Sequence, residues 1–193
     1  MLLDREENTH NNDEGKNGEV WQPRCGVSIR EIELGLFLFQ FYHTLDIQRI
    51  LKLGPWSFNR YLLILGIIKD GDIPSQIPLF KVPFWIQIDN VSMGFYSQIV
   101  GQNLGNHIDE FLDYDVKNTQ QFWRTYMRLR VLIDVRHTLK KSKRIKKQGG
   151  EAIEVIFKYE CLGPYCFFYR LLGHLDDNCE RLFSMPHDDG KRS

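Results

Sequence analysis

The chain has 193 residues, of which 42% are hydrophobic, so it carries enough apolar side chains for a sizeable core and is not a disordered polypeptide. Its formal net charge is zero, and no apolar run reaches the roughly 18 residues of a membrane span. Because residues 1–19 are polar and acid-rich, we expect no secretory signal peptide and place the protein in the nucleus or cytoplasm. Length and composition predict one domain, or one domain with an appendage, and no membrane partner.

Asn, Asp, Glu and Gly dominate residues 1–19, and the absence of a hydrophobic period predicts a disordered leader there. Alternating and continuous apolar patterns then predict regular structure. Strands are expected over residues 27–34, 36–42 and 62–68, and a helix over residues 46–53 that ends at Gly54-Pro55.

A proline-rich loop over residues 70–83 precedes a second cycle of strands and a helix. The helix is predicted over residues 97–112, although Gly101 and Gly105 each weaken this prediction by about 1 kcal/mol relative to alanine. Further strands are predicted over residues 84–89, 126–135 and 153–159. These cycles, with one solvated sheet face, predict an α+β sandwich of the split β-α-β kind.

Charge is unevenly distributed along this neutral chain. Residues 117–147 contain eleven basic side chains and one acid, Asp134, so the rest of the chain has a net charge of −10. The outward face of the strand at 126–135 and the loop predicted at 137–150 offer side chains for phosphates and bases: Tyr126, Arg128, Arg130, Lys140, Lys141, Lys143, Arg144, Lys146 and Lys147. The pattern predicts contact with nucleic acid; a solvated sheet edge and a nuclear import signal are the alternatives.

Cys166, His174 and Cys179 stand at three of the four positions of a C-x2-C-x4-H-x4-C zinc knuckle, and Tyr169 stands where the second cysteine belongs. Structural zinc takes four sulfur or nitrogen ligands, and a tyrosine must lose a proton of pKa about 10 before it can bind a metal. Three of the four cysteines lie within 19 residues, which favours metal ligands over disulfides. Two hypotheses stay open, a zinc site and a set of solvated thiols and imidazole.

Catalytic patterns are missing from the sequence. The chain has no glycine-rich phosphate loop, nucleophile elbow or paired-carboxylate motif. A zinc hydrolase that uses the three knuckle ligands would lack an identifiable general base. We therefore predict that the protein is not an enzyme and has no small-molecule substrate.

Several short motifs resemble a plant domain of unknown function that precedes a zinc knuckle and derives from the gag-like proteins of non-LTR retrotransposons. The resemblance covers residues 20–179. It rests on motifs that include Gly54-Pro55-Trp56, Phe58-Asn59-Arg60, Val82-Pro83-Phe84-Trp85, Phe122-Trp123-Arg124, Tyr126-Met127-Arg128-Leu129-Arg130 and the knuckle itself, with Phe167, Phe168 and Gly173.

The resemblance implies an RRM-like α+β domain at 20–160, a knuckle at 161–183, zinc held by the knuckle, and nucleic-acid binding. We predict binding of single-stranded RNA or DNA with Phe167 against a base, and a disordered tail at 184–193. The chain departs from the family pattern at Tyr169 and at Arg170, which replaces a glycine. It also shows no first strand within residues 1–19, so we expect an N-terminally truncated domain and a degenerate knuckle. The alternatives are a self-associating protein-interaction module and a transposon remnant without function.

Overall fold

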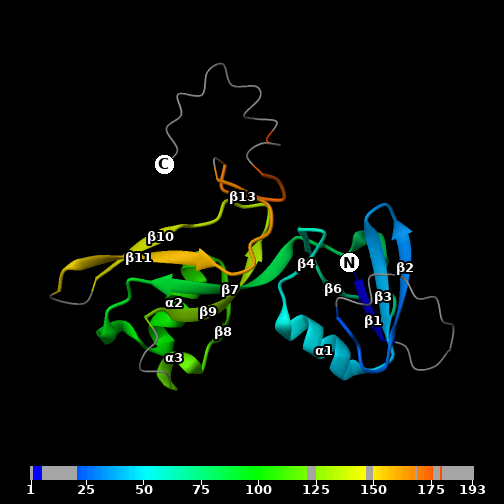
Figure 1. Cartoon of the computed structure of the whole chain (residues 1–193), viewed down its shortest axis with the longest axis horizontal. Helices are drawn as coiled ribbons and strands as arrows, with labels where there is room; N and C mark the ends of the chain where they lie inside the picture. The colour runs from blue at the N-terminus through cyan, green and yellow to red at the C-terminus, as the bar shows by residue number, and fades with distance from the viewer. Residues whose placement is uncertain are drawn as a thin grey trace, which may run out of the picture. The chain divides into compact units, whose positions relative to one another are not determined.

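The computed structural model describes residues 2–5, 21–120, 125–146, 150–167, 169–175 and 179. It has mixed α+β architecture and divides into two compact units, residues 1–56 with 63–80, and residues 57–62 with 81–193 (Figure 1). No helix among the described residues is long and apolar enough to cross a membrane.

The first unit is built on a four-stranded sheet in the order β2-β3-β1-β6. Its strands are β1 (Leu2–Arg5), β2 (Val27–Glu33), β3 (Leu36–Phe41) and β6 (Gly66–Ile67), followed by a short 3-10 turn at Pro74–Gln76. β2 pairs antiparallel with β3, whereas β1 runs parallel to both β3 and β6.

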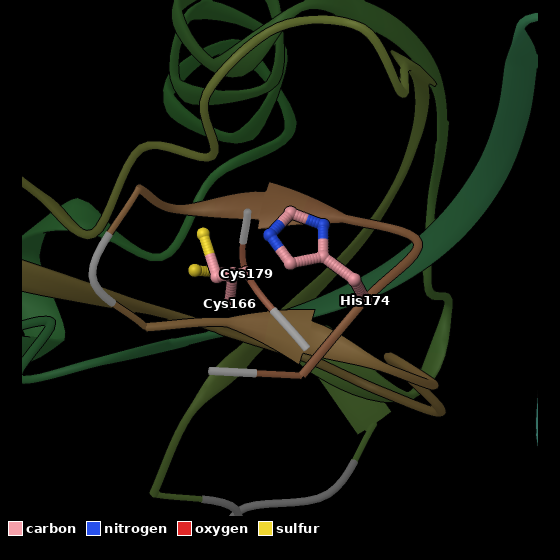
Figure 2. A group of neighbouring side chains, drawn as sticks. All are labelled: Cys166, His174 and Cys179. Carbon is pink, nitrogen blue, oxygen red and sulfur yellow. The ribbon is translucent and has the colours of Figure 1, made fainter. Parts of the chain in front are cut away.

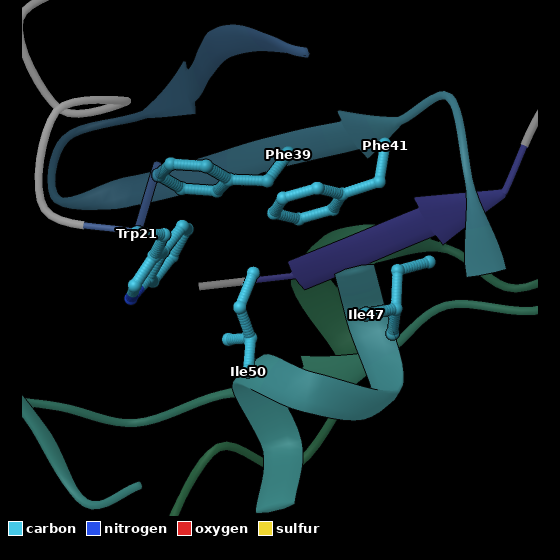
Figure 3. Close-up of a cluster of buried hydrophobic side chains, with 5 residues drawn as sticks. All are labelled: Trp21, Phe39, Phe41, Ile47 and Ile50. Atoms are coloured by element: carbon cyan, nitrogen blue, oxygen red, sulfur yellow. The ribbon is translucent and has the colours of Figure 1, made fainter. Parts of the chain in front are cut away.

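One helix, α1 (Thr44–Leu53), covers this sheet. His43 caps its start by accepting a hydrogen bond from the Leu45 amide, and Gly54 follows its last residue. The helix and strand β3 enclose a cluster of buried side chains (Figure 3), whose members are Trp21, Phe39, Phe41, Ile47 and Ile50. The 3.6-residue spacing of Ile47 and Ile50 and the alternation of Phe39 and Phe41 bring these side chains to one core.

Strand β1 corrects the sequence prediction for residues 1–19. Leu2–Arg5 were expected to be disordered and to leave the sheet without a first strand, but they form a strand between β3 and β6. Four residues are too few to show a hydrophobic period, and the pairing partners lie more than 30 residues away. The rest of the predicted leader and the predicted tail at 184–193 lie outside the described residues.

The second unit contains a five-stranded antiparallel sheet in the order β10-β11-β7-β9-β8. Its strands are β7 (Lys81–Asp89), β8 (Glu110–Tyr114), β9 (Met127–Asp134), β10 (Ser142–Lys146) and β11 (Ala152–Tyr159). Helix α2 (Gln98–Ile108) joins β7 to β8, a 3-10 turn spans Met93–Phe95, and the short helix α3 (Lys117–Gln120) precedes β9.

One face of this sheet packs under α2. The inward side chains of β7 and β9 are almost fully buried: Val82, Phe84, Ile86, Ile88, Met127, Leu129, Val131 and Ile133. Leu104 and Ile108 cover them from the helix. The strict alternation at residues 127–133 predicted this inward face, and the structure confirms it.

The two glycines of α2 lie at its closest approach to the sheet. A β-carbon on Gly101 would lie 2.6 Å from the Tyr114 ring, and one on Gly105 would lie 2.6 Å from the Phe111 ring. From the sequence alone, both glycines were expected to lower the stability of this helix. Here they let the helix backbone approach β8 where no larger residue fits.

Two small hairpins complete the described chain. The first, β4 (Trp56–Phe58) with β5 (Tyr61–Leu63), turns through Asn59 and Arg60, which both have positive φ. Residues 57–62 of this hairpin belong to the second unit, where the Arg60 carbonyl would lie 3.6 Å from a β-carbon added to Gly163. The second hairpin, β12 (Tyr165–Cys166) with β13 (Leu171–Leu172), carries the first predicted metal ligand, Cys166, and the other two follow it in the chain.

Candidate metal centre and nucleic-acid interface

The β12–β13 hairpin brings Cys166, His174 and Cys179, which we call the ligand triad, into one cluster (Figure 2). Their two sulfurs and an imidazole nitrogen lie within 4.8 Å of one another. Cys166 and Cys179 are buried, and the buried Nε2 of His174 has no hydrogen-bond partner among the described residues.

The triad fits zinc in its chemistry and nearly in its geometry. Bonds of about 2.3 Å to sulfur and 2.0 Å to nitrogen place the ligands of a tetrahedral zinc ion roughly 3.5 to 3.8 Å apart, so the triad must close by roughly 1 Å. A buried imidazole nitrogen without a partner is costly, and coordination of a metal ion would satisfy it.

The turn around Cys166 supports that sulfur. The Tyr169 amide donates to Cys166 Sγ at 3.4 Å, and the Gly173 amide donates to the Pro164 carbonyl at 2.9 Å. Tyr169 is half-buried at the position of the missing cysteine, while Cys161 is exposed and is not part of the cluster.

Arg170 has φ +58°, the left-handed conformation that glycine adopts readily and other residues adopt at a cost of roughly 1 kcal/mol. We expect Arg170→Gly to stabilise the knuckle by about that amount and to raise its apparent zinc affinity a few-fold. Competition titration against a chromophoric chelator measures this change. Arg170→Ala is the control, because alanine removes the guanidinium and keeps the strain; an equal gain in both variants would contradict the backbone argument.

Strand β10 corrects the prediction of a basic loop over residues 137–150. Residues 142–146 pair with β11 at the edge of the sheet, and Ile145 lies opposite Ile153. The five-residue alternation was hidden by its lysines and arginine, because side chains at a sheet edge do not have to be apolar. Arg144 and Lys146 are exposed and Lys143 is half-buried; Lys147 lies outside the described residues.

We call Lys140, Lys141, Lys143, Arg144 and Lys146 the basic edge. Within the described part of the chain, no ion pair joins Lys143, Arg144 or Lys146 to a carboxylate. Other basic side chains of the second unit are ion-paired: Lys81 with Glu110, Arg128 with Glu160, Arg136 with Asp134 and Lys158 with Asp89.

The charge of the basic edge affects the ionisation of His107 in the last turn of α2. Burial lowers the pKa of His107 below its ordinary value, and the nearby charges of Lys143 and Lys140 lower it further. Lys140 also donates from Nζ to the His107 carbonyl. The edge therefore creates the positive local field that favours an anionic ligand.

Arg128 and Arg130 differ from the prediction of a solvated strand face. Arg128 bonds Glu160 (Nη2–Oε2 2.8 Å) and Asp115 (Nη1–Oδ2 3.3 Å), and its guanidinium lies 3.9 Å from the centre of the Trp85 ring. The hydrogen bond to Glu160 is the main cause of its raised pKa. Arg130 is only 7% exposed and lies 5.5 Å from the same ring, and burial lowers its pKa.

The sequence missed these partners because they come from three strands. Trp85 lies opposite Arg130 in the β7–β9 ladder, and Glu160 directly follows β11, so their meeting depends on register. Tyr126 is half-buried just before β9. Phe167 is 65% exposed beside the triad and packs edge-on against Tyr165; Phe168 lies outside the described residues.

Comparisons with known proteins place two family models on the chain. A model described as a domain of unknown function (DUF4283) matches residues 18–71, and one described as a zinc knuckle matches residues 133–181. An uncharacterised Arabidopsis thaliana protein, At4g02000, is 20% identical over 136 residues, which cover 70% of this chain and 43% of that protein. The chain thus spans less than half of that relative's length. No solved structure matches.

Proposed function

We propose that this chain, in which a match to a domain of unknown function (DUF4283) precedes a match to a zinc knuckle, is a non-enzymatic protein that binds single-stranded nucleic acid. The basic edge would contact phosphates, and the exposed Phe167 would stack on a base. The observation that carries the proposal is the position of β10. It is an edge strand whose basic side chains, among the described residues, make none of the ion pairs that hold other basic residues of this unit.

Zinc belongs to this proposal. The ligand triad would hold the ion, and the bound metal would supply structural cross-linking of the knuckle. With three protein ligands, the fourth position beside Tyr169 would be left to water. Tyr126 would extend the interface at the start of β9, whereas the ion-paired Arg128 and the buried Arg130 would support the sheet through Trp85.

An RRM-like origin of the second unit is also part of the proposal. The strand order β11-β7-β9-β8, with α2 between β7 and β8, supports a split β-α-β arrangement. The full β-α-β-β-α-β pattern has its second helix between its third and fourth strands. At that place, between β9 and β11, the described part of this chain forms strand β10. The chain would then use an edge strand in place of that helix and present its basic residues there.

Removing the basic side chains of β10 tests the proposal. In the variant Lys143→Ala, Arg144→Ala, Lys146→Ala, we expect weaker binding to all oligonucleotides, irrespective of sequence. The slope of log K against log salt should become shallower by about one unit for each phosphate that the protein no longer neutralises. Fluorescence anisotropy of a labelled single-stranded RNA, titrated at several salt concentrations with zinc present, measures both effects.

A charge-matched control separates position from net charge. The variant Lys69→Ala, Lys81→Ala, Lys158→Ala loses the same three charges elsewhere, two of them from ion pairs. We expect its binding to stay close to that of the unchanged protein. An equal loss of oligonucleotide affinity in both variants would show that the basic edge acts only through the net charge of the protein. Absence of binding at low salt would refute nucleic-acid recognition.

A protein-interaction module is the second candidate, supported by the first unit. Its strand β2 lies at the sheet edge, and the adjoining turn carries the fully exposed Leu34. An edge strand with an exposed apolar side chain is a template for pairing with another chain. This reading predicts oligomers that persist at high salt, and a monomer in sedimentation at tens of micromolar would contradict it.

A further inference from the structure

We propose that the ligand triad and the basic edge form one coupled site, in which zinc binding and nucleic-acid binding strengthen each other. The inference rests on the proposed function and adds a regulatory property to it. It starts from the hydrogen bonds that hold residues 139–141, which lead into β10.

Three successive residues of this segment are held by two different elements, the knuckle turn and strand β11. The Leu139 amide donates to the Arg170 carbonyl of the knuckle turn at 2.9 Å. The Lys140 carbonyl accepts from the Tyr159 hydroxyl at 2.8 Å, and the Lys141 carbonyl accepts from the Phe157 amide at 2.7 Å. Lys140 and Lys141 are therefore both fixed by β11, and Leu139 is fixed by the knuckle.

Leu139 is a buried residue that links the knuckle turn to the segment before β10. Its side chain is 4% exposed, although it stands between polar neighbours in a segment that leads to the edge of the sheet. A buried backbone amide that loses its acceptor is destabilised. The path of the chain into Lys140 and Lys141 thus depends on where the knuckle places the Arg170 carbonyl.

The fold of the knuckle turn depends on the bound metal. Its strands β12 and β13 are two residues long, and its buried centre is the ligand triad itself. Sites of this size are largely unfolded without their ion. With the triad empty, the Arg170 carbonyl is no longer held in position, and the first of the three anchors of residues 139–141 is lost.

The consequence is reciprocal by thermodynamic linkage. If zinc orders the segment that carries Lys140 and Lys141, bound nucleic acid that prefers this order must raise the zinc affinity by the same factor. Couplings of this kind amount to about 5- to 150-fold in affinity. We expect a single-stranded oligonucleotide at saturating concentration to tighten zinc binding about tenfold.

Competition titration tests this with the full chain. The zinc dissociation constant is measured against a chromophoric chelator without and with saturating single-stranded oligouridylate, at low salt. The Lys143→Ala, Arg144→Ala, Lys146→Ala variant is the control for zinc that the RNA itself binds. Its zinc affinity without RNA should match that of the unchanged protein. RNA should change the zinc dissociation constant of this variant much less.

Amide hydrogen exchange gives a second readout that needs no substitution. Zinc should increase the protection of the Leu139 amide, which bonds to the knuckle, and leave the Phe157 amide, which bonds within the sheet to Lys141, unchanged. RNA that binds without any shift in zinc affinity would overturn the coupling and leave the proposed function standing. Absence of RNA binding would instead overturn the proposed function, while unchanged Leu139 protection would refute the link on its own.

Discussion

Replacing Tyr169 with cysteine is expected to raise the affinity of the knuckle for zinc about a hundredfold. Structural zinc sites with four ligands are worth about 10–16 kcal/mol at neutral pH, so one further thiolate contributes about 3 kcal/mol, or two factors of ten. The backbone at this position is already folded around the site, because the Tyr169 amide donates to Cys166 Sγ at 3.4 Å. The new thiol therefore starts close to the triad.

Two measurements check this expectation. Chelator competition gives the dissociation constant, and the absorption of bound cobalt(II) reports whether a third thiolate has joined a tetrahedral site. Tyr169→Ser is the control, since it removes the phenol ring without adding a metal-binding sulfur, and it should bring no comparable gain. An unchanged zinc affinity in Tyr169→Cys would show that residue 169 does not stand at a ligand position.

Replacing the two glycines of α2 with alanine is expected to destabilise the second unit, although alanine has the higher helix propensity. On an exposed helix, Gly→Ala stabilises by about 1 kcal/mol. At Gly101 and Gly105 the added methyl group would meet the rings of Tyr114 and Phe111 at 2.6 Å, and such overpacking costs about 1–3 kcal/mol. After the gain in helix propensity is subtracted, the variant with both replacements should lose up to about 4 kcal/mol of unfolding free energy.

Urea denaturation, followed by far-UV circular dichroism, measures this loss. Asn103→Ala provides the control within the same helix, because Asn103 is exposed and alanine is the better helix former there. It should stabilise by about 0.5 kcal/mol. If the double glycine variant were also more stable than the unchanged protein, the close approach of α2 to β8 would be refuted.

The elements with the strongest periodicity could be predicted from the sequence. Strand β9 lies within one residue of its predicted bounds and helix α2 within four, because a buried face imposes a period on the residues that form it. Residues 110–112, predicted to end that helix, instead begin strand β8. The spacing of Cys166, His174 and Cys179 predicted a cluster that the structure also brings together. Both signals are local in the chain.

The features that the sequence missed depend on distant partners. Strand β1 is recognised only through its pairing with β3 and β6, and β10 only through its pairing with β11. Arg130 followed the predicted alternation correctly and is nevertheless buried, because the packing of neighbouring side chains around it is set by register and not by the strand's own sequence. Periodicity assigns a face; it does not say what covers that face.

The division of the chain has a practical consequence for dissecting this protein. Residues 57–62 lie in the sequence of the first unit but belong to the second, so the polypeptide passes between the two units three times. A fragment that starts at Lys81 would lose the Arg60 carbonyl and Leu62, which adjoin Gly163 in the segment that leads into the knuckle. Independent study of the second unit therefore requires residues 57–62 to be supplied with it, for example through a circularly permuted gene.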